Sequence, residues 1–175
     1  MPEPNQAVFL SYASQDVEAA QSICEALRAG GIEVCFDQSE LRGGDSWDQK
    51  IRREIRECAL FMPVISANTQ ARHEGYFRLE WRLADQRTHL MGKIRAFLVP
   101  VCIDETRDAG ADVPDSFAQV QWTPLPQGQT PPAFVARVRD LLRPEQPRGA
   151  ALTGAVAVSD PRARSRRVAP ATSSR

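Results

Sequence analysis

Apolar runs and amphipathic segments alternate along this chain in an order typical of strands followed by helices. An apolar run begins after Ala7 and stops in a polar turn that ends at Asp16. From Asp16 to Ala29 apolar residues recur every three or four positions, which predicts a helix with one buried stripe. Ser14 or Asp16 can cap this helix. The junction predicts hydroxyl and backbone N–H groups at the carboxyl end of a strand, where open α/β sheets bind ligands.

The next segments repeat the same order. Residues 32–36 predict a short strand, and residues 37–45 predict a polar loop that contains glycine. Ser46 is expected to cap a second helix, whose apolar positions recur at intervals of four. Residues 59–65 are almost continuously apolar, as expected for a central strand covered on both faces.

Later segments continue the alternation: a polar loop at 66–75, a helix at 76–91, a strand at 94–103, a weaker strand at 120–122 and a helix at 134–142. Pro100 must lie at a strand end, at a bulge or at an unpaired position, because it has no N–H to donate. Strands and helices in this order require right-handed crossovers. The fold class is therefore α/β, with a parallel sheet and helices on both faces.

Charge is distributed unevenly between two regions. Residues 1–142 carry 15 Lys and Arg against 20 Asp and Glu, whereas residues 143–175 carry 7 against 2. We expect one domain over 1–142, followed by a disordered tail or linker rich in Pro, Arg, Ala and Ser over 143–175. Acidic residues are interleaved with the arginines of the domain, so no nucleic-acid surface is predicted.

The cysteines and histidines predict no metal site. The four cysteines are single residues inside apolar segments, without the paired spacing of a zinc site, and are expected to be reduced core residues. His73 and His89 have no partner at ligand spacing and are expected at the surface. No apolar run reaches the roughly 18 residues of a membrane span. The sequence therefore predicts a cytoplasmic protein without a membrane partner, and a secreted effector acting in a host cytoplasm is the alternative.

Three segments in series resemble the toll/interleukin-1 receptor (TIR) domain family, and their form resembles its bacterial members. They are residues 9–16 (FLSYASQD), residues 31–37 and 41–47 (GIEVCFD and LRGGDSW), and residues 64–68 leading to 76–81 (VISAN and YFRLEW). The resemblance implies a flavodoxin-like sheet of five parallel strands. It also implies one of two roles: cleavage of the nicotinamide–ribose bond of NAD, or a non-catalytic adaptor acting through TIR–TIR contacts.

Glu80 is the catalytic candidate that the resemblance implies, because enzymatic members carry a glutamate at this position. Tyr76 lies four residues earlier, on the same face of the predicted helix, where the family commonly has Trp. The alternative is a solvated glutamate that pairs with Arg78, Arg82 or Arg87. One carboxylate suffices for this chemistry, since nicotinamide departs as a neutral molecule and needs no general acid.

The other candidates bind substrate in this interpretation. Ser11, Tyr12 and Ser14 follow the first strand and are positioned to contact ribose or pyrophosphate, with helix capping as the alternative for Ser14. Asp37 and Ser66 follow the second and third strands. Arg42 and Gly43 belong to a loop that either closes over the ligand or stays exposed. The three tryptophans are expected to pack in the interior.

We therefore predict an NAD nucleosidase for bacterial defence or effector signalling, giving nicotinamide with ADP-ribose or a cyclic isomer. NAD is the substrate, and no cofactor or metal is required. Expected protein partners are further copies of the chain and other TIR proteins, and a non-catalytic interaction module is the alternative function. A phosphorylated receiver domain is disfavoured, because Ser11, Tyr12 and Ser66 stand where that class needs acidic residues.

Overall fold

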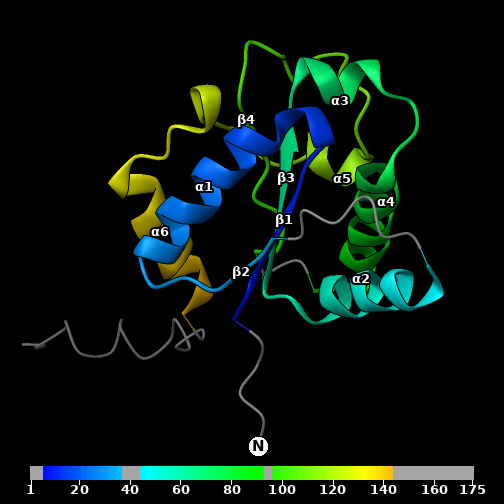
Figure 1. Ribbon diagram of the computed structural model, residues 1–175, viewed down its shortest axis with the longest axis horizontal. Helices are drawn as coiled ribbons and strands as arrows, with labels where there is room; N and C mark the ends of the chain where they lie inside the picture. The colour runs from blue at the N-terminus through cyan, green and yellow to red at the C-terminus, as the bar shows by residue number, and fades with distance from the viewer. Residues whose placement is uncertain (1–5, 37–43, 93–95, 144–175) are drawn as a thin grey trace, which may run out of the picture. The chain divides into compact units, whose positions relative to one another are not determined.

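The computed structural model describes residues 6–36, 44–92 and 96–143, and these form a five-stranded parallel sheet with helices on both faces (Figure 1). The strands are β1 (Val8–Ser11), β2 (Val34–Cys35), β3 (Leu60–Ile65), β4 (Val101–Cys102) and β5 (Thr123–Pro124). Their order in the sheet is β2-β1-β3-β4-β5. This is the flavodoxin-like order: β2 lies on one side of β1, and β3, β4 and β5 follow on the other side.

The helices divide between the two faces of the sheet. They are η1 (Ser14–Asp16), α1 (Val17–Ala29), α2 (Asp45–Glu57), α3 (Ala67–Ala71), α4 (Tyr76–His89), α5 (Asp115–Ala118), η2 (Pro126–Gly128) and α6 (Pro132–Leu142). Helices α1 and α6 cover one face, while α2, α4 and α5 cover the other (Figure 1). The sequence-based prediction of an α/β fold with helices on both faces is confirmed.

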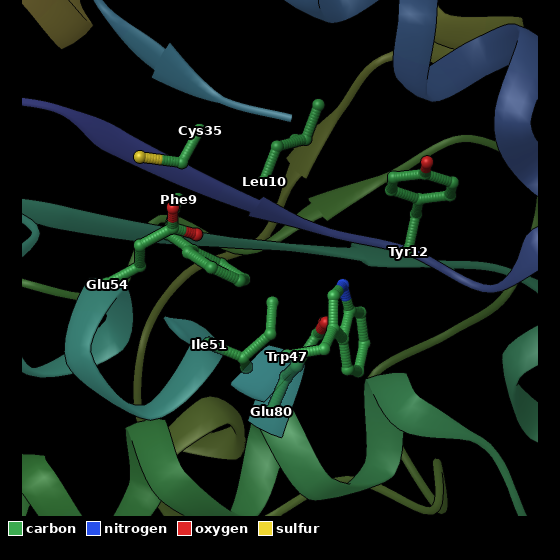
Figure 2. A pocket seen from close by; sticks show the side chains of 8 residues that line it. All are labelled: Phe9, Leu10, Tyr12, Cys35, Trp47, Ile51, Glu54 and Glu80. Carbon is green, nitrogen blue, oxygen red and sulfur yellow. The ribbon is translucent and has the colours of Figure 1, made fainter. Parts of the chain in front are cut away.

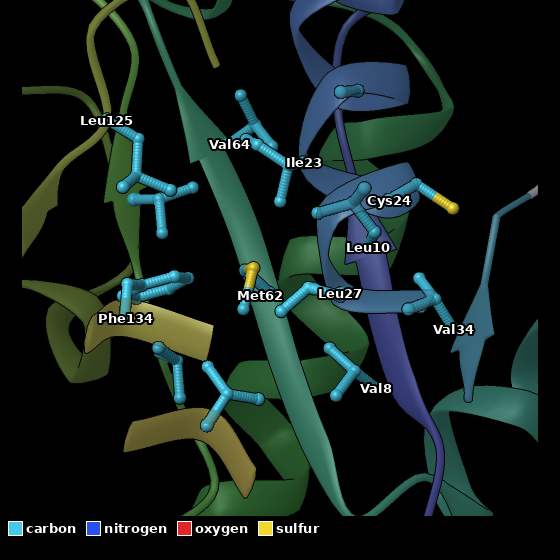
Figure 3. Close-up of a cluster of buried hydrophobic side chains, with 14 of the residues drawn as sticks. Val8, Leu10, Ile23, Cys24, Leu27, Val34, Met62, Val64, Leu125 and Phe134 are labelled. Atoms are coloured by element: carbon cyan, nitrogen blue, oxygen red, sulfur yellow. The ribbon is translucent and has the colours of Figure 1, made fainter. Parts of the chain in front are cut away.

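Two hydrophobic clusters lie on opposite faces of the sheet because successive side chains of a strand alternate. Val8 and Leu10 of β1 pack against α1 and α6 in the cluster shown in Figure 3. Phe9 points the other way and stacks on Phe61 of β3 at 5.5 Å between ring centroids. All six residues of β3 are buried, which confirms it as the central strand.

The fourth strand is shorter than the predicted strand 94–103, and Pro63 explains part of the loss. Phe61 donates its N–H to the carbonyl of Phe97 at 2.8 Å. Pro63 lies two residues further along β3, so its nitrogen faces the same neighbouring segment, residues 97–102. Proline has no N–H to donate to that segment. The pairing is therefore reduced to an isolated bridge between Phe61 and Leu98 and to the two residues of β4. Pro100 lies immediately before β4, one of the three places expected for it. Residues 93–95 lie outside the described residues.

The predicted fifth strand at 120–122 is misplaced. Strand β5 begins at Thr123, whose N–H donates to the carbonyl of Pro100 at 2.9 Å. Val120 is exposed and belongs to no strand. Single-sequence patterns locate such a short edge strand poorly, because only one of its sides is paired.

The predicted capping residues were wrong for the first two long helices. Neither Ser14 nor Asp16 makes a side-chain cap to α1 or η1, and Gly44 rather than Ser46 occupies the N-cap position of α2. Residues 66–75 contain helix α3 and not only loop. Ser66 caps it, accepting a hydrogen bond from the N–H of Thr69 at 3.2 Å, while Thr69 Oγ1 accepts one from the N–H of Ser66 at 3.0 Å.

Among the described residues, no helix has the length and apolar character needed to cross a membrane. The predicted tail falls outside them from residue 144 onward.

Close packing between α1 and η2 leads to a test of the fold. Gly128 has φ +79°, and a Cβ atom there would lie 2.4 Å from the carbonyl oxygen of Ala19. We expect Gly128→Ala to lower the free energy of unfolding by about 1–3 kcal/mol, since it combines left-handed backbone strain with a backbone clash. Urea denaturation of both proteins measures this change. Gly92→Ala is the control, because no heavy atom of the described residues lies within 4 Å of its added Cβ beyond its chain neighbours. A similar loss in the control would contradict the explanation.

Candidate functional site

A small pocket lies where β1 and β2 meet helices α2 and α4 (Figure 2). Its lining residues are Phe9, Leu10, Tyr12, Cys35, Trp47, Ile51, Glu54 and Glu80. The cavity volume is about 20 Å³, which is enough for a water molecule, and the pocket is not closed off from solvent. Aromatic and aliphatic side chains dominate the wall, and Glu54 and Glu80 are the charged residues among the described ones that line it.

Glu80 enters the pocket because it lies on the buried stripe of α4, together with Phe77, Trp81 and Ala84. Its side chain is only 9% exposed, and Ser11 donates its hydroxyl hydrogen to the Glu80 carboxylate. Ser11 is the last residue of β1 and is 1% exposed. A hydroxyl that donates to a carboxylate stabilises the charged form and fixes its orientation.

Burial contradicts the alternative in which Glu80 is a solvated residue of an arginine-rich helix face. Arg78 pairs instead with Asp112 at 3.1 Å. Arg87 donates to the carbonyls of Ile55 and Cys58 at 2.6 and 2.7 Å. Arg78 also donates to the carbonyls of Thr69 and Arg72, at 2.6 and 2.9 Å. Both arginines therefore bind backbone carbonyls of neighbouring segments, while Glu80 is buried.

Aromatic rings surround the carboxylate on the side of α2. Trp47 lines the pocket and meets Tyr76 edge to face, with 4.4 Å between ring centroids. Tyr76 is half-buried and is not in the pocket lining. Tyr12 lines the pocket and stacks on Phe36 at 5.2 Å. Trp47, which the sequence suggested only as a packing residue, is therefore part of the pocket wall.

Three predicted binding residues, Ser11, Ser14 and Ser66, are not in the pocket lining, although Ser11 is hydrogen-bonded to Glu80, which is. Ser14 is exposed and accepts a hydrogen bond from Arg72 at 2.8 Å. Ser66 is buried and donates to the carboxylate of Asp16 at 2.5 Å, which also accepts from Asn68 at 2.7 Å. Ser66 holds helix α3 against the start of α1.

Three further predicted residues, Asp37, Arg42 and Gly43, lie outside the described residues. His73 and His89 are exposed, as predicted. Within the described part of the chain, no group of three or more His, Cys, Asp or Glu side chains is arranged to hold a metal ion.

Sequence reasoning missed Glu54 and Cys35 as pocket residues. Glu54 lies seven residues after Trp47 and three after Ile51, which is the spacing of one helix face, so the buried stripe of α2 already contained the signal. Cys35 of β2 pairs with Phe9 of β1. The residues next to Cys35 in the sequence do not indicate that it lines a pocket. Glu54 makes an ion pair with Lys50 at 3.7 Å.

The described cysteines are all free thiols, as expected. Cys24, Cys58 and Cys102 are buried, whereas Cys35 is half-buried at the pocket. Burial raises the pKa of Cys35 to about 11, and the negative charges of Glu54 and then Glu33 add to the increase. The negative charge of Glu54 therefore acts on the Cys35 thiol, and both residues line the pocket.

Comparison with known proteins identifies the family. The family model described as TIR domain matches residues 8–142. A curated relative, the 2′ cyclic ADP-D-ribose synthase BtTIR of Bacteroides thetaiotaomicron, is 36% identical over 69 residues, which are 38% of this chain and 24% of that protein. The chain thus matches about a quarter of the length of this relative.

Solved structures agree on the fold. The metazoan TIR-STING receptor from C. gigas in complex with 2′,3′-cGAMP matches with a TM-score of 0.58 and 19% identity, covering 84% of this chain and 43% of that one. The same receptor in a second structure gives a TM-score of 0.56 and 17% identity, covering 83% and 43%. At this identity the likeness shows the fold alone.

The flavodoxin-like strand order, with a buried glutamate beside the end of β1, places the chain among the open parallel α/β domains. The match over residues 8–142 goes further: the chain belongs to the TIR domain family.

The Ser11–Glu80 hydrogen bond leads to a stability prediction. Ser11→Ala should lower the free energy of unfolding by about 1–3 kcal/mol, because it removes a donor from a buried carboxylate. A double-mutant cycle with Glu80→Ala, which removes the acceptor, should give a coupling of at least about 0.5 kcal/mol in urea denaturation. Ser46→Ala is the control, because Ser46 is an exposed residue of α2. Strictly additive changes would show that the two side chains do not interact.

The field of Glu54 at Cys35 is also testable. Only the thiolate reacts with an alkylating agent, and at a pKa of about 11 its fraction at pH 8 is about 10⁻³. We expect Glu54→Gln to lower the pKa of Cys35 and to raise its rate of alkylation by iodoacetamide several-fold at pH 8. Peptide mass spectrometry measures the rate at Cys35 alone. Glu57→Gln, exposed on the same helix, should change nothing, and equal rates in both variants would contradict the placement of Glu54.

Proposed function

We propose that this TIR domain cleaves the nicotinamide–ribose bond of NAD and that Glu80 is its catalytic residue. The observation that carries the proposal is the burial of the Glu80 carboxylate at the carboxyl end of β1, held by Ser11 and facing a pocket. Active sites of open α/β sheets lie at this edge. A relative that is a cyclic ADP-ribose synthase supports the proposal, because such a product is made by breaking the same bond.

The chemistry that this carboxylate would supply is electrostatic. As the bond between C1′ and the pyridinium nitrogen breaks, the electron pair leaves with nicotinamide and positive charge develops on the ribose. A buried, pre-oriented carboxylate stabilises that charge more than an exposed one, because water screens it less. Ser11 is a positioning residue in this scheme, since its hydroxyl is already committed to Glu80.

The size of the pocket limits how NAD would bind. A cavity of about 20 Å³ is too small to enclose a nucleotide, so the dinucleotide would lie across the mouth of the pocket and present its nicotinamide ribose to Glu80. Trp47, which lines the pocket, is placed to contact this ribose from α2, and Tyr76 of α4 packs against Trp47. Binding would then involve movement of side chains at the mouth.

The same narrow pocket favours a second candidate function, a non-catalytic interaction module. In that case the domain works through contacts with other TIR domains, and the buried glutamate has a structural role only. Self-association fits both functions. If catalysis depends on assembly, nicotinamide release per molecule rises with protein concentration; an interaction module associates without releasing any.

Glu80→Gln tests the proposal because it keeps the shape and removes the charge. We expect nicotinamide release from NAD by concentrated protein to fall by about 10²-fold or more, as for loss of an electrostatic stabiliser. Chromatography of the products measures release, and circular dichroism checks folding. Glu74→Gln, exposed before α4, is the matched control. Unchanged release in folded Glu80→Gln would reject the assignment.

A further inference from the structure

We propose that Arg72 binds the diphosphate of NAD, and that the site therefore selects a dinucleotide over nicotinamide riboside, which has no phosphate. This inference rests on the proposed cleavage of NAD and adds a substrate-binding residue and a specificity to it. It is carried by the position of the Arg72 guanidinium, by the N–H groups that this guanidinium leaves unused, and by the negative charge of the pocket wall.

Arg72 connects the segments that follow β1 and β3, two neighbouring strands of the sheet. It is the C-cap residue of α3, and its Nη1 donates to Ser14 Oγ at 2.8 Å and to Gln15 Oε1 at 3.1 Å. Both acceptors belong to η1, which follows β1. The long helices that come next, α1 and α4, cover opposite faces of the sheet (Figure 1). Open α/β sheets bind ligands at such a point, outside the carboxyl ends of the strands.

The guanidinium is oriented by neutral groups and keeps one edge unused. Nη1 donates to Ser14 and Gln15, whereas no residue of the described segments accepts a hydrogen bond from Nε or Nη2. Within the same segments Arg72 forms no ion pair. Its backbone is held in place, because its carbonyl accepts from Arg78 Nη2 at 2.9 Å. Nε and Nη2 share one edge of the planar group, and such an edge binds two oxygens of a phosphate.

This unused edge lies near Glu80. Nη2 is 3.5 Å from the point where a Cβ atom of Gly75 would stand. Gly75 is the N-cap residue of α4, and Glu80 follows five residues later, about 7.5 Å along a helix axis. Helical side chains lean toward the N-terminus, so Glu80 leans toward Gly75. Ser14, the contact on the other side, comes three residues after Ser11, which donates to Glu80.

The separation suits the proposed substrate. In NAD only the ribose ring and C5′ stand between C1′ and the first oxygen of the diphosphate. A nicotinamide ribose beside Glu80 therefore has its phosphate within a few bonds of the reacting carbon, on the scale of the distance from Glu80 to Gly75. The side of the ribose that faces the start of α4 leads the phosphate to Arg72.

Charge favours the same placement. Glu54 and Glu80, the charged residues among the described ones that line the pocket, repel a diphosphate. Arg78, the next arginine along the chain, already forms an ion pair. Asp16, the carboxylate of η1, is buried and accepts hydrogen bonds from donors at the start of α3. Arg72 therefore offers a positive charge at this edge that no described carboxylate neutralises by direct contact.

Arg72→Gln tests the inference with two substrates on the full chain. Nicotinamide riboside has the same scissile bond as NAD but no phosphate, and chromatography measures nicotinamide release from each. The wild-type chain should prefer NAD by about tenfold or more in kcat/KM. Arg72→Gln should raise KM for NAD by about tenfold or more, because hydrogen bonds to a charged group are lost. It should leave kcat, and kcat/KM for the riboside, within about twofold of wild type.

Arg82→Gln is the matched control, because it removes an exposed arginine of α4 and should behave as wild type. Arg72→Lys keeps the charge without the planar edge and should recover only part of the affinity for NAD. Equal losses with both substrates in Arg72→Gln would show that Arg72 only holds α3 against η1, and would overturn the inference. An unchanged KM for NAD, or a wild-type chain that does not prefer NAD, would also overturn it.

Binding of ADP-ribose gives a readout that does not depend on turnover. ADP-ribose carries the same diphosphate, and calorimetry should show its dissociation constant rising by about tenfold or more in Arg72→Gln but not in Arg82→Gln. Salt should weaken binding to the wild-type chain more than binding to Arg72→Gln, since a charge contact is lost in the variant. Unchanged affinity or unchanged salt dependence overturns the inference and leaves NAD cleavage standing. A wild-type chain that releases no nicotinamide from either substrate overturns both proposals.

Discussion

A buried carboxylate at the end of β1 is the constraint around which this domain is built. Removing a charged group from water is costly unless hydrogen bonds replace the solvent, and Ser11 provides one from the last residue of the strand. The register that pairs Ser11 with Pro63 of β3 fixes that hydroxyl in the sheet. On the other side, Phe77, Trp81 and Ala84 bury the same face of α4 and so force Glu80 inward. The position of the carboxylate follows from the packing of strand and helix together.

The two helices that carry acidic residues to the pocket are held to each other by contacts away from it. Arg87 of α4 donates to the carbonyls of Ile55 and Cys58 at the end of α2, and its guanidinium lies 4.4 Å from the centre of the Phe97 ring. Trp47 and Tyr76 meet near the other ends of the helices. These contacts fix α2 relative to α4, and therefore Glu54 relative to Glu80.

Periodicity was enough to predict the α/β class, the central strand and the long helices, because hydrophobic stripes record which faces are buried. Periodicity failed where contacts between residues far apart in the sequence determine strand length and the partners of polar side chains. Pro63 interrupts the hydrogen bonding of β3 to the strand that contains β4. The carboxylate of Asp16 accepts from Ser66 and Asn68 rather than capping α1. The resemblance pointed to Glu80, and its burial came only with the fold. The spacing of Glu54 from Trp47 and Ile51 places it on the buried face of α2, but its charge suggested a solvent-exposed position. Ser14 and Ser66 follow their strands as expected, yet their hydroxyls are used by Arg72, Asp16 and Thr69.

The most direct test of the central claim is a crystal structure of the full chain with an NAD analogue in which carbon replaces the ring oxygen of the nicotinamide ribose. That analogue cannot form an oxocarbenium ion and stays intact. We expect its nicotinamide ribose to lie beside the Glu80 carboxylate at the mouth of the pocket, with Ser11 still donating to Glu80. An analogue bound away from Glu80, or a Glu80 side chain turned from the ribose in every copy, would contradict the account.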